Sequence, residues 1–534
     1  VPAPLPPRRA RRSGAMTGTW ALLRLVLRRD RLLMPLWIVG LAVAPLGYLS
    51  SIKAAYPDAA SRQHFYDLNA ASATFVVRNG PLYGSSVGNL LAWQCGFVPV
   101  VVGLIALLTV VRHTRTEEEA GRRELTGATV VGRHAGLAAA VLAACGACLG
   151  YGVLVGLGVG AQGVPFAGAF ALGLGFSLVG WVFAGVGAVV AQLTWSASGA
   201  RGLGIGGLVL AFLLRAAGDS GSAGWLAWLS PIGWAHRLRP FAGEQWWVLL
   251  LGLAGTGLLV VVAVVLSARR DLGAALLPAR LGRATAKASL RSPLALAWRL
   301  QRGTLLVWTG CLALVGLLMG GVGKNVAEMM RDNKAVADVF ARLGGGGAVT
   351  DAYLAGTMTL FGLAAAGYAV QATLKLRAEE AAGRAEPLLA TAVGRVGWAL
   401  THLTFALLGS ALALAITGLA TGAAFGSGAS LVPAALAQLP AVWVLAGLAA
   451  LLIGVFPRFA AAAWGLLAAF LLLSLVGSAL QWNDVVLGIS PFQHLARLPG
   501  GTFSVVPVLW LALIALAAGA VGLMALRRRD IPVG

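Results

Sequence analysis

The chain has 534 residues and a formal net charge of +22; 58% of its residues are apolar, only 11% are charged, and 72 are glycines. Soluble domains are about 25% charged and about half apolar, and a soluble fold of this length has too small an interior for so much apolar surface. The composition excludes a soluble protein, and with it a basic nucleic-acid-binding domain, because the charges must first be placed relative to a bilayer.

Twelve apolar runs are long enough to cross a bilayer as helices, which takes about 20 residues each. In chain order they cover about 32–52, 89–111, 134–159, 166–195, 202–218, 246–267, 304–323, 352–374, 396–421, 432–455, 459–481 and 503–526. They are continuous and rich in Ala and Leu, unlike the short alternating segments of a membrane β-barrel. The sequence therefore predicts an all-α integral membrane protein with about twelve transmembrane helices.

Basic residues indicate how these helices are oriented. With both termini in the cytoplasm, the inside segments hold 30 of the 41 Lys and Arg residues and the outside segments hold 11. Since basic residues are enriched in cytoplasmic loops, this bias predicts cytoplasmic termini and an even number of spans. The Arg-, Ala- and Gly-rich composition is typical of a high-GC bacterial gene. We expect a multi-pass protein of the bacterial cytoplasmic membrane whose basic inner face meets anionic membrane lipids.

The chain contains an internal repeat, with five motifs recurring in the same order at offsets between 259 and 271. The pairs are Glu117–Glu124 with Glu379–Glu386, Gly132-Arg133 with Gly394-Arg395, Ser230-Pro231 with Ser490-Pro491, Arg269-Arg270-Asp271 with Arg528-Arg529-Asp530, and Arg28, Arg31 and Trp37 with Arg299, Arg302 and Trp308. Because each copy holds six predicted spans, an even number, the two halves are expected to be parallel six-helix repeats related by an axis along the membrane normal.

Each predicted half has the same order of parts. An Arg-rich amphipathic stretch, Trp20–Arg31 or Ala295–Arg302, comes first and is expected to lie along the inner membrane surface. Outer segments at about 53–88 and 324–351, and outer loops at about 219–245 and 482–502, are expected to contain short helices. The expected organisation is a disordered basic N-terminus at 1–15, a first half at 16–267, a cytoplasmic linker at 268–294 and a second half at 295–534.

A charged stretch with the pattern Glu-Glu-x-x-Gly-Arg-x-Glu follows the second span of each half. Glu118 and Arg122 are spaced i,i+4, as are Glu380 and Arg384, and such pairs support a short helix. The glycine of each copy permits a second backbone to approach, or breaks the helix. A solvated loop that only sets topology is one interpretation. However, acidic residues contribute little to topology, so their recurrence favours a protein-binding element.

Together, the charged stretch, the six spans per unit, the amphipathic lead-in and the outer loop before the sixth span resemble permeases of the ABC-transporter superfamily. More narrowly they resemble type II ABC exporters, especially the fused-dimer permeases of actinobacteria in the tetronasin and polyketide-antibiotic export group. The resemblance covers roughly 16–534 and implies that the charged stretch is a coupling helix that docks into a groove of an ATPase. The coupling residues it implies are Glu117, Glu118, Gly121, Arg122 and Glu124, and in the second copy Glu379, Glu380, Gly383, Arg384 and Glu386.

The chain shows no ATP-binding motif of its own. The stretch 320–325 comes nearest to a phosphate-binding loop, but it lacks the first Gly and the Ser or Thr of the motif Gly-x4-Gly-Lys-Ser/Thr. We therefore expect a transport subunit that is not an enzyme by itself and holds no cofactor. The resemblance implies a separate ATP-binding subunit, expected in two copies, that binds ATP and Mg²⁺.

The resemblance also implies hydrophobic or amphipathic cargo, such as antibiotics, polyketides, drugs or lipids, exported between spans 2 and 5 of the two halves. The few polar side chains in these spans favour such cargo over sugars or ions. Ordinary packing of aromatic side chains is the alternative for each candidate. The substrate-path candidates are Trp93, Gln94, Phe97, Phe212, Arg215, Phe361, Tyr368 and Phe470.

Two other functions stay open at this point. An ion-coupled secondary transporter with twelve helices needs ionisable groups inside the membrane. Nearly all 19 acidic residues fall in loops, and Arg215, the best buried charge, has Asp219 at i,i+4 as a structural partner. A polytopic membrane enzyme acting on lipid-linked substrates needs catalytic carboxylates or a metal site. The six histidines are scattered along the chain, so the sequence indicates no metal site.

Overall fold

The computed structural model describes residues 14–70, 73–127, 129–220, 223–270, 275–276, 285, 290, 292–332, 346–474 and 483–530. The chain divides into two units, Val1–Gly282 and Arg283–Gly534. The described residues form helices and turns and no strand, and eleven of their helices are long and apolar enough to span a membrane. This confirms the predicted all-α integral membrane class.

The number of spans stays a prediction, because the eleventh predicted run, 459–481, is described only in part. It contains an 11-residue apolar helix, α21 (Ala462–Leu472), while 475–482 lie outside the described residues. The predicted disordered segment 1–15 falls almost wholly outside them too, as do most of the predicted linker 268–294 and much of the segment 324–351.

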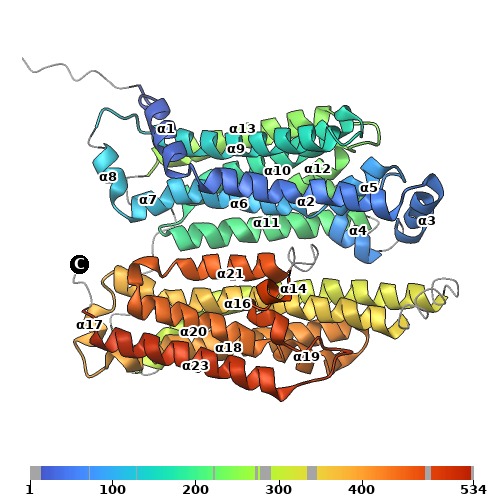
Figure 1. Ribbon diagram of the computed structural model, residues 1–534. Coiled ribbons are helices and arrows are strands. Elements are labelled where there is room, and N and C mark those ends of the chain that lie inside the picture. The colour runs from blue at the N-terminus through green and yellow to red at the C-terminus, as the bar shows by residue number, and fades with distance from the viewer. Residues whose placement is uncertain are drawn as a thin grey trace, which may run out of the picture. The chain divides into compact units, whose positions relative to one another are not determined.

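The first unit is a bundle of long helices with short helices at both ends (Figure 1). Its elements are α1 (Thr19–Arg29), α2 (Leu33–Ala55), α3 (Ala59–Asn69), α4 (Ala73–Asn79), α5 (Val87–Gln94), α6 (Val98–His113), α7 (Arg115–Glu119), α8 (Arg122–Gly127), α9 (Ala135–Gly160), α10 (Phe166–Leu193), α11 (Ala197–Ser220), η1 (Gly224–Leu229), α12 (Pro231–Arg237) and α13 (Trp247–Ala268). The largely buried α10 lies at the centre and packs on α6, α9, α11 and α13. The short helices α7 and α8 lie at one end of the unit, and α3 and α4 at the other.

The second unit is also a bundle of long helices, and three of its helices are longer than those of the first unit, with 40, 36 and 31 residues. Its elements are α14 (Pro293–Asp332), α16 (Gly346–Ala381), α17 (Glu386–Leu389), α18 (Arg395–Phe425), η3 (Gly428–Leu431), α19 (Val432–Leu436), α20 (Leu439–Val455), η4 (Pro457–Phe459), α21, α22 (Asp484–Leu487), η6 (Pro491–His494) and α23 (Val505–Arg528). The long helices α16, α18 and α20 pack on one another, and α23 packs along α20. As predicted, short helices occupy the outer segment and the outer loop of the first unit and the described part of the outer loop of the second. The described residues of the second outer segment, 324–351, instead belong to the ends of the long helices α14 and α16.

Small residues allow the closest helix contacts in each unit. A Cβ atom added to Gly152 of α9 would lie 2.5 Å from the carbonyl oxygen of Gly173 in α10. In the second unit, a Cβ added to Gly454 of α20 would lie 2.1 Å from the carbonyl oxygen of Gly522 in α23. Since lipid chains are as apolar as leucine, membrane helices gain association energy from such close packing. The many glycines are therefore part of the packing of each unit.

Two predicted elements are wrong in detail. The second predicted span, 89–111, is broken at Cys95–Phe97 into α5 and α6. Pro99 in the first turn of α6 has no N–H and disfavours a helix through the preceding residues. At the break, Gly96 packs so closely that an added Cβ would lie 2.0 Å from the carbonyl oxygen of Asn79. The second amphipathic lead-in, Ala295–Arg302, is not a separate helix but the start of the 40-residue α14.

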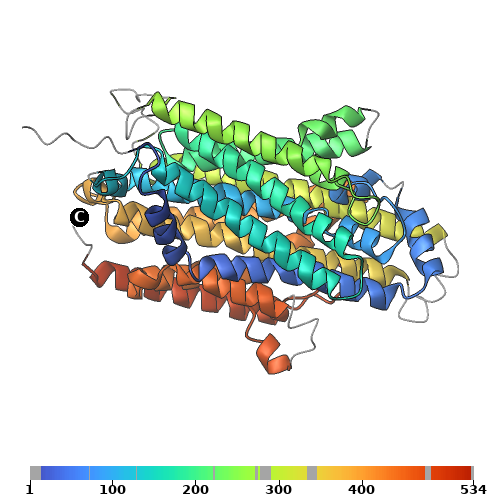
Figure 2. The same cartoon turned by 90° about the horizontal axis from the view of Figure 1, so that it is seen from above.

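The first amphipathic lead-in does form a separate helix, α1. Figures 1 and 2 show it running across the long helices of its unit rather than along them. The turn into α2 is stabilised by the buried carboxylate of Asp30, which lies 2.9 Å from Arg112 and 2.6 Å from His113. The residue at the equivalent repeat position is Gln301, which instead donates to the carbonyl of Ala372 at 3.0 Å. The lead-ins of the two units therefore differ in both shape and chemistry.

Candidate functional site

Repeated motifs that are distant in sequence meet at one end of each unit, in what we call the charged cluster. In the first unit it consists of Arg115, Glu117, Glu118, Arg122, Arg133 and Arg270, and in the second of Arg377, Glu379, Glu380, Arg384, Arg395 and Arg529. Equivalent members are separated by 262 residues, except for the last pair, separated by 259. The sequence repeat is thus a repeated set of contacts.

A buried carboxylate is the centre of the first cluster. The side chain of Glu118, only 4% exposed, receives two hydrogen bonds from Arg270, at 2.6 and 2.9 Å, and lies 3.0 Å from Arg115. Arg270 follows the end of α13, so this bidentate pair ties the charged stretch to the last helix of the unit. Charge-assisted bidentate pairs are among the stronger hydrogen bonds in proteins.

The second cluster repeats this arrangement. Glu380, whose side chain is 1% exposed, accepts two hydrogen bonds from Arg529 at 2.7 and 2.9 Å. Arg377 lies 3.2 Å from Glu380 and precedes it by three residues. Arg115 has the same spacing to Glu118 in the first unit. Arg529 follows the end of α23, so the same tie between the charged stretch and the last helix is present in both units.

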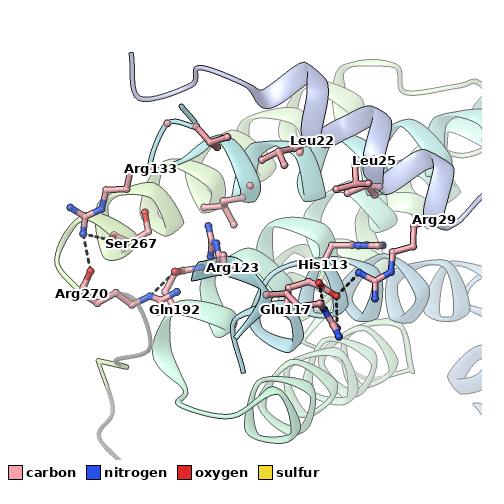
Figure 3. Close-up of a pocket in the computed structure, with 17 residues that line it drawn as sticks. Leu22, Leu25, Arg29, His113, Glu117, Arg123, Arg133, Gln192, Ser267 and Arg270 are labelled. Carbon is pink, nitrogen blue, oxygen red and sulfur yellow. Dashed lines mark hydrogen bonds and ion pairs between the residues drawn. The ribbon is translucent and has the colours of Figure 1, made fainter. Parts of the chain in front are cut away.

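A second arginine caps the end of the same helix in each unit. Arg133 donates to three carbonyl oxygens in and after the last turn of α13, at 2.8 to 3.1 Å (Figure 3). Arg395 donates to the carbonyl oxygen of Arg529 at 2.6 Å. The last carbonyls of a helix lack intrahelical partners and carry partial negative charge, so an arginine stabilises them.

The glycines of the charged stretch break the helix. Gly121 has φ 70° and Gly383 has φ 68°, a left-handed conformation that favours glycine. A Cβ atom added to either would meet nothing within 4 Å, so neither glycine is needed for close approach within the chain. Each glycine therefore turns the backbone at an exposed tip, between α7 and α8 in the first unit and between α16 and α17 in the second.

The predicted i,i+4 ion pairs are wrong by one residue. Arg122 donates to Glu117 at 2.7 and 2.9 Å, and Arg384 to Glu379 at 2.7 and 3.1 Å, both at i,i+5 across the glycine turn. The second glutamate of each copy, which we call the inner glutamate, is bound by the arginine after the last helix instead. Glu118 is bound by Arg270, and Glu380 by Arg529. The hydrogen bond from Arg122 to Glu117 raises the pKa of this arginine above its ordinary value.

The ten predicted coupling residues therefore separate into two layers. The glycines, the arginines that follow them and the last glutamates form the exposed tip; the guanidinium side chains are 51% and 59% exposed. The first glutamate of each copy is largely covered, and the second is buried. The tip residues are Gly121, Arg122, Glu124, Gly383, Arg384 and Glu386. A partner that docks here reaches the tip and not the inner glutamates.

The sequence analysis did not identify the arginines that complete each cluster. It found Arg133, Arg270, Arg395 and Arg529 only as repeat landmarks. Their recurrence with the acidic motif was the available signal: Arg133 and Arg395 each follow the second glutamate by 15 residues, and Arg270 and Arg529 follow it by 152 and 149. Groups that recur together in the same order are candidates for mutual contact. Arg29 of α1, which donates to Glu117 at 2.6 Å, carried no such signal because the equivalent residue is Leu300.

The substrate-path candidates of the first unit fall into two settings. Trp93 is buried against Phe65 and Phe75, with ring centroids 5.6 Å apart in both pairs, and lines a cavity of only about 30 Å³. Phe97 is 46% exposed and contacts the buried Phe212 edge to face, at 6.0 Å. Gln94, the last residue of α5, is half-buried. Of these aromatic residues, Phe97 alone presents a largely exposed face.

Arg215 is fully buried and has a structural setting. It donates to the carbonyl oxygens of Val76 and Val77 in α4, at 3.2 and 2.8 Å, and lies 4.6 Å above the ring of Phe212. Asp219, the partner expected from the sequence, is 4.0 Å away. Arg215 therefore attaches α4 to α11, and its carbonyl bonds are shorter than its ion pair.

The candidates of the second unit lie in its apolar core. Phe361, Tyr368 and Phe470 are all buried, and the tyrosine hydroxyl donates to the carbonyl of Phe405 at 2.9 Å. Their predicted position opposite the first set stays a prediction. Over the described part of the chain, no group of three or more His, Cys, Asp or Glu residues is arranged to hold a metal ion.

Comparisons with known proteins place this architecture in a family. The chain is 45% identical over 530 residues to the multidrug efflux system permease protein Rv1217c of Mycobacterium tuberculosis (strain ATCC 25618 / H37Rv), a match that covers 97% of this chain and 96% of that protein. Residues 290–527 match the family model described as the C-terminal domain of the multidrug efflux system permease Rv1217c. With its apolar helices, the chain is a multi-pass bacterial membrane protein, and it belongs to the Rv1217c family of multidrug efflux system permeases.

Proposed function

We propose that the chain is the permease subunit of an ATP-driven exporter of the type II ABC class, in the fused-dimer tetronasin and polyketide-antibiotic group. It moves hydrophobic or amphipathic compounds, such as antibiotics, polyketides, drugs or lipids, out of the cell. The name of the mycobacterial relative supports drug efflux. The observation that carries the ATP-driven part is the exposed tip repeated in both units, each tied to a transmembrane helix by a buried bidentate ion pair.

The ATP would be hydrolysed by a separate subunit, expected in two copies, one for each tip. That subunit would hold ATP and Mg²⁺, while this chain supplies the docking surfaces and the transmembrane path. Arg122 and Arg384, which are half exposed, and the exposed Glu124 and Glu386 give each tip both signs of charge. Charges of both signs steer a complementary partner and orient it on the surface.

The contacts of the cluster provide a path for force from the tip into the membrane. In the first unit, α7 follows α6 after the single residue Thr114, and Glu118 of α7 is bonded to Arg270 after α13. In the second unit Glu380 is part of α16 itself and is bonded to Arg529 after α23. When the ATPase subunits close on ATP, displacement of a tip would move two helices of its unit together. The helices then tilt and release cargo outward or into the outer leaflet.

The test is to purify the chain with the ATP-binding protein encoded beside it and to measure cargo-stimulated ATP hydrolysis. The variant R122E/R384E reverses one exposed charge on each tip and should reduce complex formation and stimulation at least tenfold. The control is His64→Glu, an exposed substitution on α3 at the opposite end of the first unit, which should leave both unchanged. Unchanged binding and turnover in the tip variant would refute the coupling assignment.

The same system separates ATP-driven export from the ion-coupled alternative. In inverted membrane vesicles, uptake of a fluorescent amphipathic drug should require ATP and should stop with vanadate. Uptake that survives vanadate and loss of the ATPase, but collapses with a protonophore, would favour an ion-coupled secondary transporter. Conversion of a lipid-linked substrate without drug movement would favour a membrane enzyme.

A further inference from the structure

A cavity of about 720 Å³ lies between α1 and the charged cluster of the first unit (Figure 3). Its volume falls within the range of pockets that hold small organic ligands, about 300–1,000 Å³. The proposed cargo path does not use it, and of the residues of the proposed ATPase tip only Arg122 lines it. Its two walls have different chemistry, and each wall limits what the cavity accepts.

The roof of the cavity is one face of α1. Leu22, Leu25 and Val26 line it at i, i+3 and i+4, and Arg29 follows at i+7. None of the residues Thr19–Arg29 is buried, and Leu25 is 55% exposed. Figure 3 shows Leu22 and Leu25 pointing from α1 toward the cluster below. An amphipathic helix stabilises itself by covering its apolar face, so a face that lies over a cavity has room for an apolar ligand.

The charged groups of the lining are mostly cationic. Five guanidinium groups and a single carboxylate, that of Glu117, line the cavity; the arginines are Arg29, Arg122, Arg123, Arg133 and Arg270. Glu118, which Arg270 binds, reduces the excess to three positive charges. This excess attracts an anion.

Arg123 shows the effect of this excess. Its side chain is 20% exposed and lies 3.9 Å from Glu118. Burial lowers the pKa of Arg123, and the charges of Arg270 and Arg115 lower it further against the opposite effect of Glu118. An anionic group in the cavity would offset both the burial of Arg123 and the repulsion by its neighbouring cations, because it replaces lost hydration and screens those cations.

The second unit contains the repeat equivalent of this cavity without its charge. A cavity of about 230 Å³ is lined by Pro293, Leu296, Ala297 and Leu300, each 271 residues after a roof residue of the first cavity. Leu300 stands where the first unit has Arg29, and Ala385 stands where it has Arg123. The charged residues that line the second cavity, Arg384 and Glu379, pair with each other. The fold of the unit therefore does not require the extra arginines.

We propose that the cavity of the first unit is a binding site for one anionic phospholipid, with its phosphate on the arginines and an acyl chain along the leucines of α1. Apolar and cationic walls side by side fit a ligand with an acyl chain and a phosphate, and basic pockets beside transmembrane helices are known to hold anionic lipid headgroups. The proposal rests on the residues that line the cavity and on the expected position of α1 at the inner membrane surface, not on the proposed ATPase coupling, so either proposal can fail without the other.

The test measures lipid binding to the purified full-length chain in detergent by native mass spectrometry. Phosphatidylglycerol and phosphatidylcholine with the same acyl chains are titrated separately. The variant R29L/R123A gives the first cavity the residues of the second unit. The control is Arg24→Ala, an exposed arginine of α1 whose repeat equivalent is Ala295. Since a hydrogen bond to a charged group contributes about 1.5–3 kcal/mol, the variant should weaken phosphatidylglycerol binding about ten- to a hundredfold, and the control should not.

A second pair of variants keeps the charge and fills the space. Leu25→Trp places a larger ring in the roof, whereas Leu27→Trp makes the same exchange at an exposed α1 position outside the lining. The first should weaken phosphatidylglycerol binding and the second should leave it unchanged. Equal binding of phosphatidylcholine, or phosphatidylglycerol binding unchanged in both R29L/R123A and Leu25→Trp, would overturn the proposal. Displacement of the lipid by millimolar inorganic phosphate alone would also overturn it, in favour of a free-phosphate site.

Discussion

The buried ion pairs of the charged cluster lead to a quantitative prediction for Arg529→Met. This substitution removes the bidentate partner of Glu380, whose side chain is 1% exposed, and leaves Arg377 at 3.2 Å as its nearest cation. Breaking a buried pair costs about 3–5 kcal/mol, because one charge stays buried without compensation. With one arginine remaining, we expect the low end, about 3 kcal/mol.

The equivalent substitution in the first unit provides an internal comparison. Glu118 retains Arg115 at 3.0 Å and Arg123 at 3.9 Å when Arg270 is replaced by Met. Two remaining cations should limit the loss to about 2 kcal/mol. The order of the two effects, larger in the second unit, follows from the number of remaining partners.

The assay is thermal unfolding of the purified chain in detergent, followed by tryptophan fluorescence. For a unit of about 250 residues, 1 kcal/mol corresponds to about 2–4 °C, so R529M should lower Tm by about 6–12 °C and R270M by about 4–8 °C. The double variant E380Q/R529M removes the uncompensated charge and should unfold at a higher temperature than R529M. A Tm for R529M within 1 °C of the wild type, or strict additivity of the two substitutions, would refute the reasoning.

Three further predictions concern the tip and the other end of the first unit. Gly383→Ala should lower the free energy of unfolding by about 1–2 kcal/mol, because an alanine is strained at its positive φ. Its control, Gly397→Ala in the first turn of α18, should be neutral or stabilising. The Tm of both variants measures the difference. Arg215→Met should release α4 from α11, so limited proteolysis should cut near 70–80 faster than in the wild type; equal cleavage rates would contradict the attachment. Burial lowers the pKa of His236 from 6.5, aided by the charge of Arg215 and opposed by Asp219. The unfolded chain then binds the proton more tightly, so stability is full above about pH 6.5 and falls as the pH drops below it; His236→Gln should flatten this slope in Tm measured between pH 7.5 and 5.

Much of this architecture is encoded locally and was predictable from the sequence. Apolar runs of about 20 residues specify helices in a membrane wherever they occur, because an unpaired backbone group is too costly in lipid. The order of the repeated motifs predicted two copies of one unit. The charged stretch was recognised as an element in its own right because its acidic residues recur where topology does not need them. For the glycine at its centre the sequence left two alternatives, close approach of a second backbone or a helix break, and the structure shows the break.

The three-dimensional packing decided which charges meet. Glu118 was expected to pair with Arg122, four residues away, but it binds Arg270, 152 residues away, because the end of α13 reaches the charged stretch and excludes water from the carboxylate. Spacing along a helix predicts only neighbours on that helix. It therefore paired Arg122 with Glu118, whereas Arg122 binds Glu117, one residue earlier. Packing likewise decides that Arg215 donates to carbonyl oxygens of α4, at shorter distances than its distance to Asp219.

The difference between the two lead-ins also depends on tertiary structure. Both are amphipathic by sequence, yet one forms the separate helix α1 and the other continues into α14. Asp30 stabilises the turn after α1 by contacts with Arg112 and His113, which lie more than 80 residues away in the chain. The neutral Gln301 at the equivalent position makes no such ion pair. The hydrophobic pattern thus predicts that these residues are helical, and the distant charges decide where the helix turns and whether a cationic cavity opens beneath it.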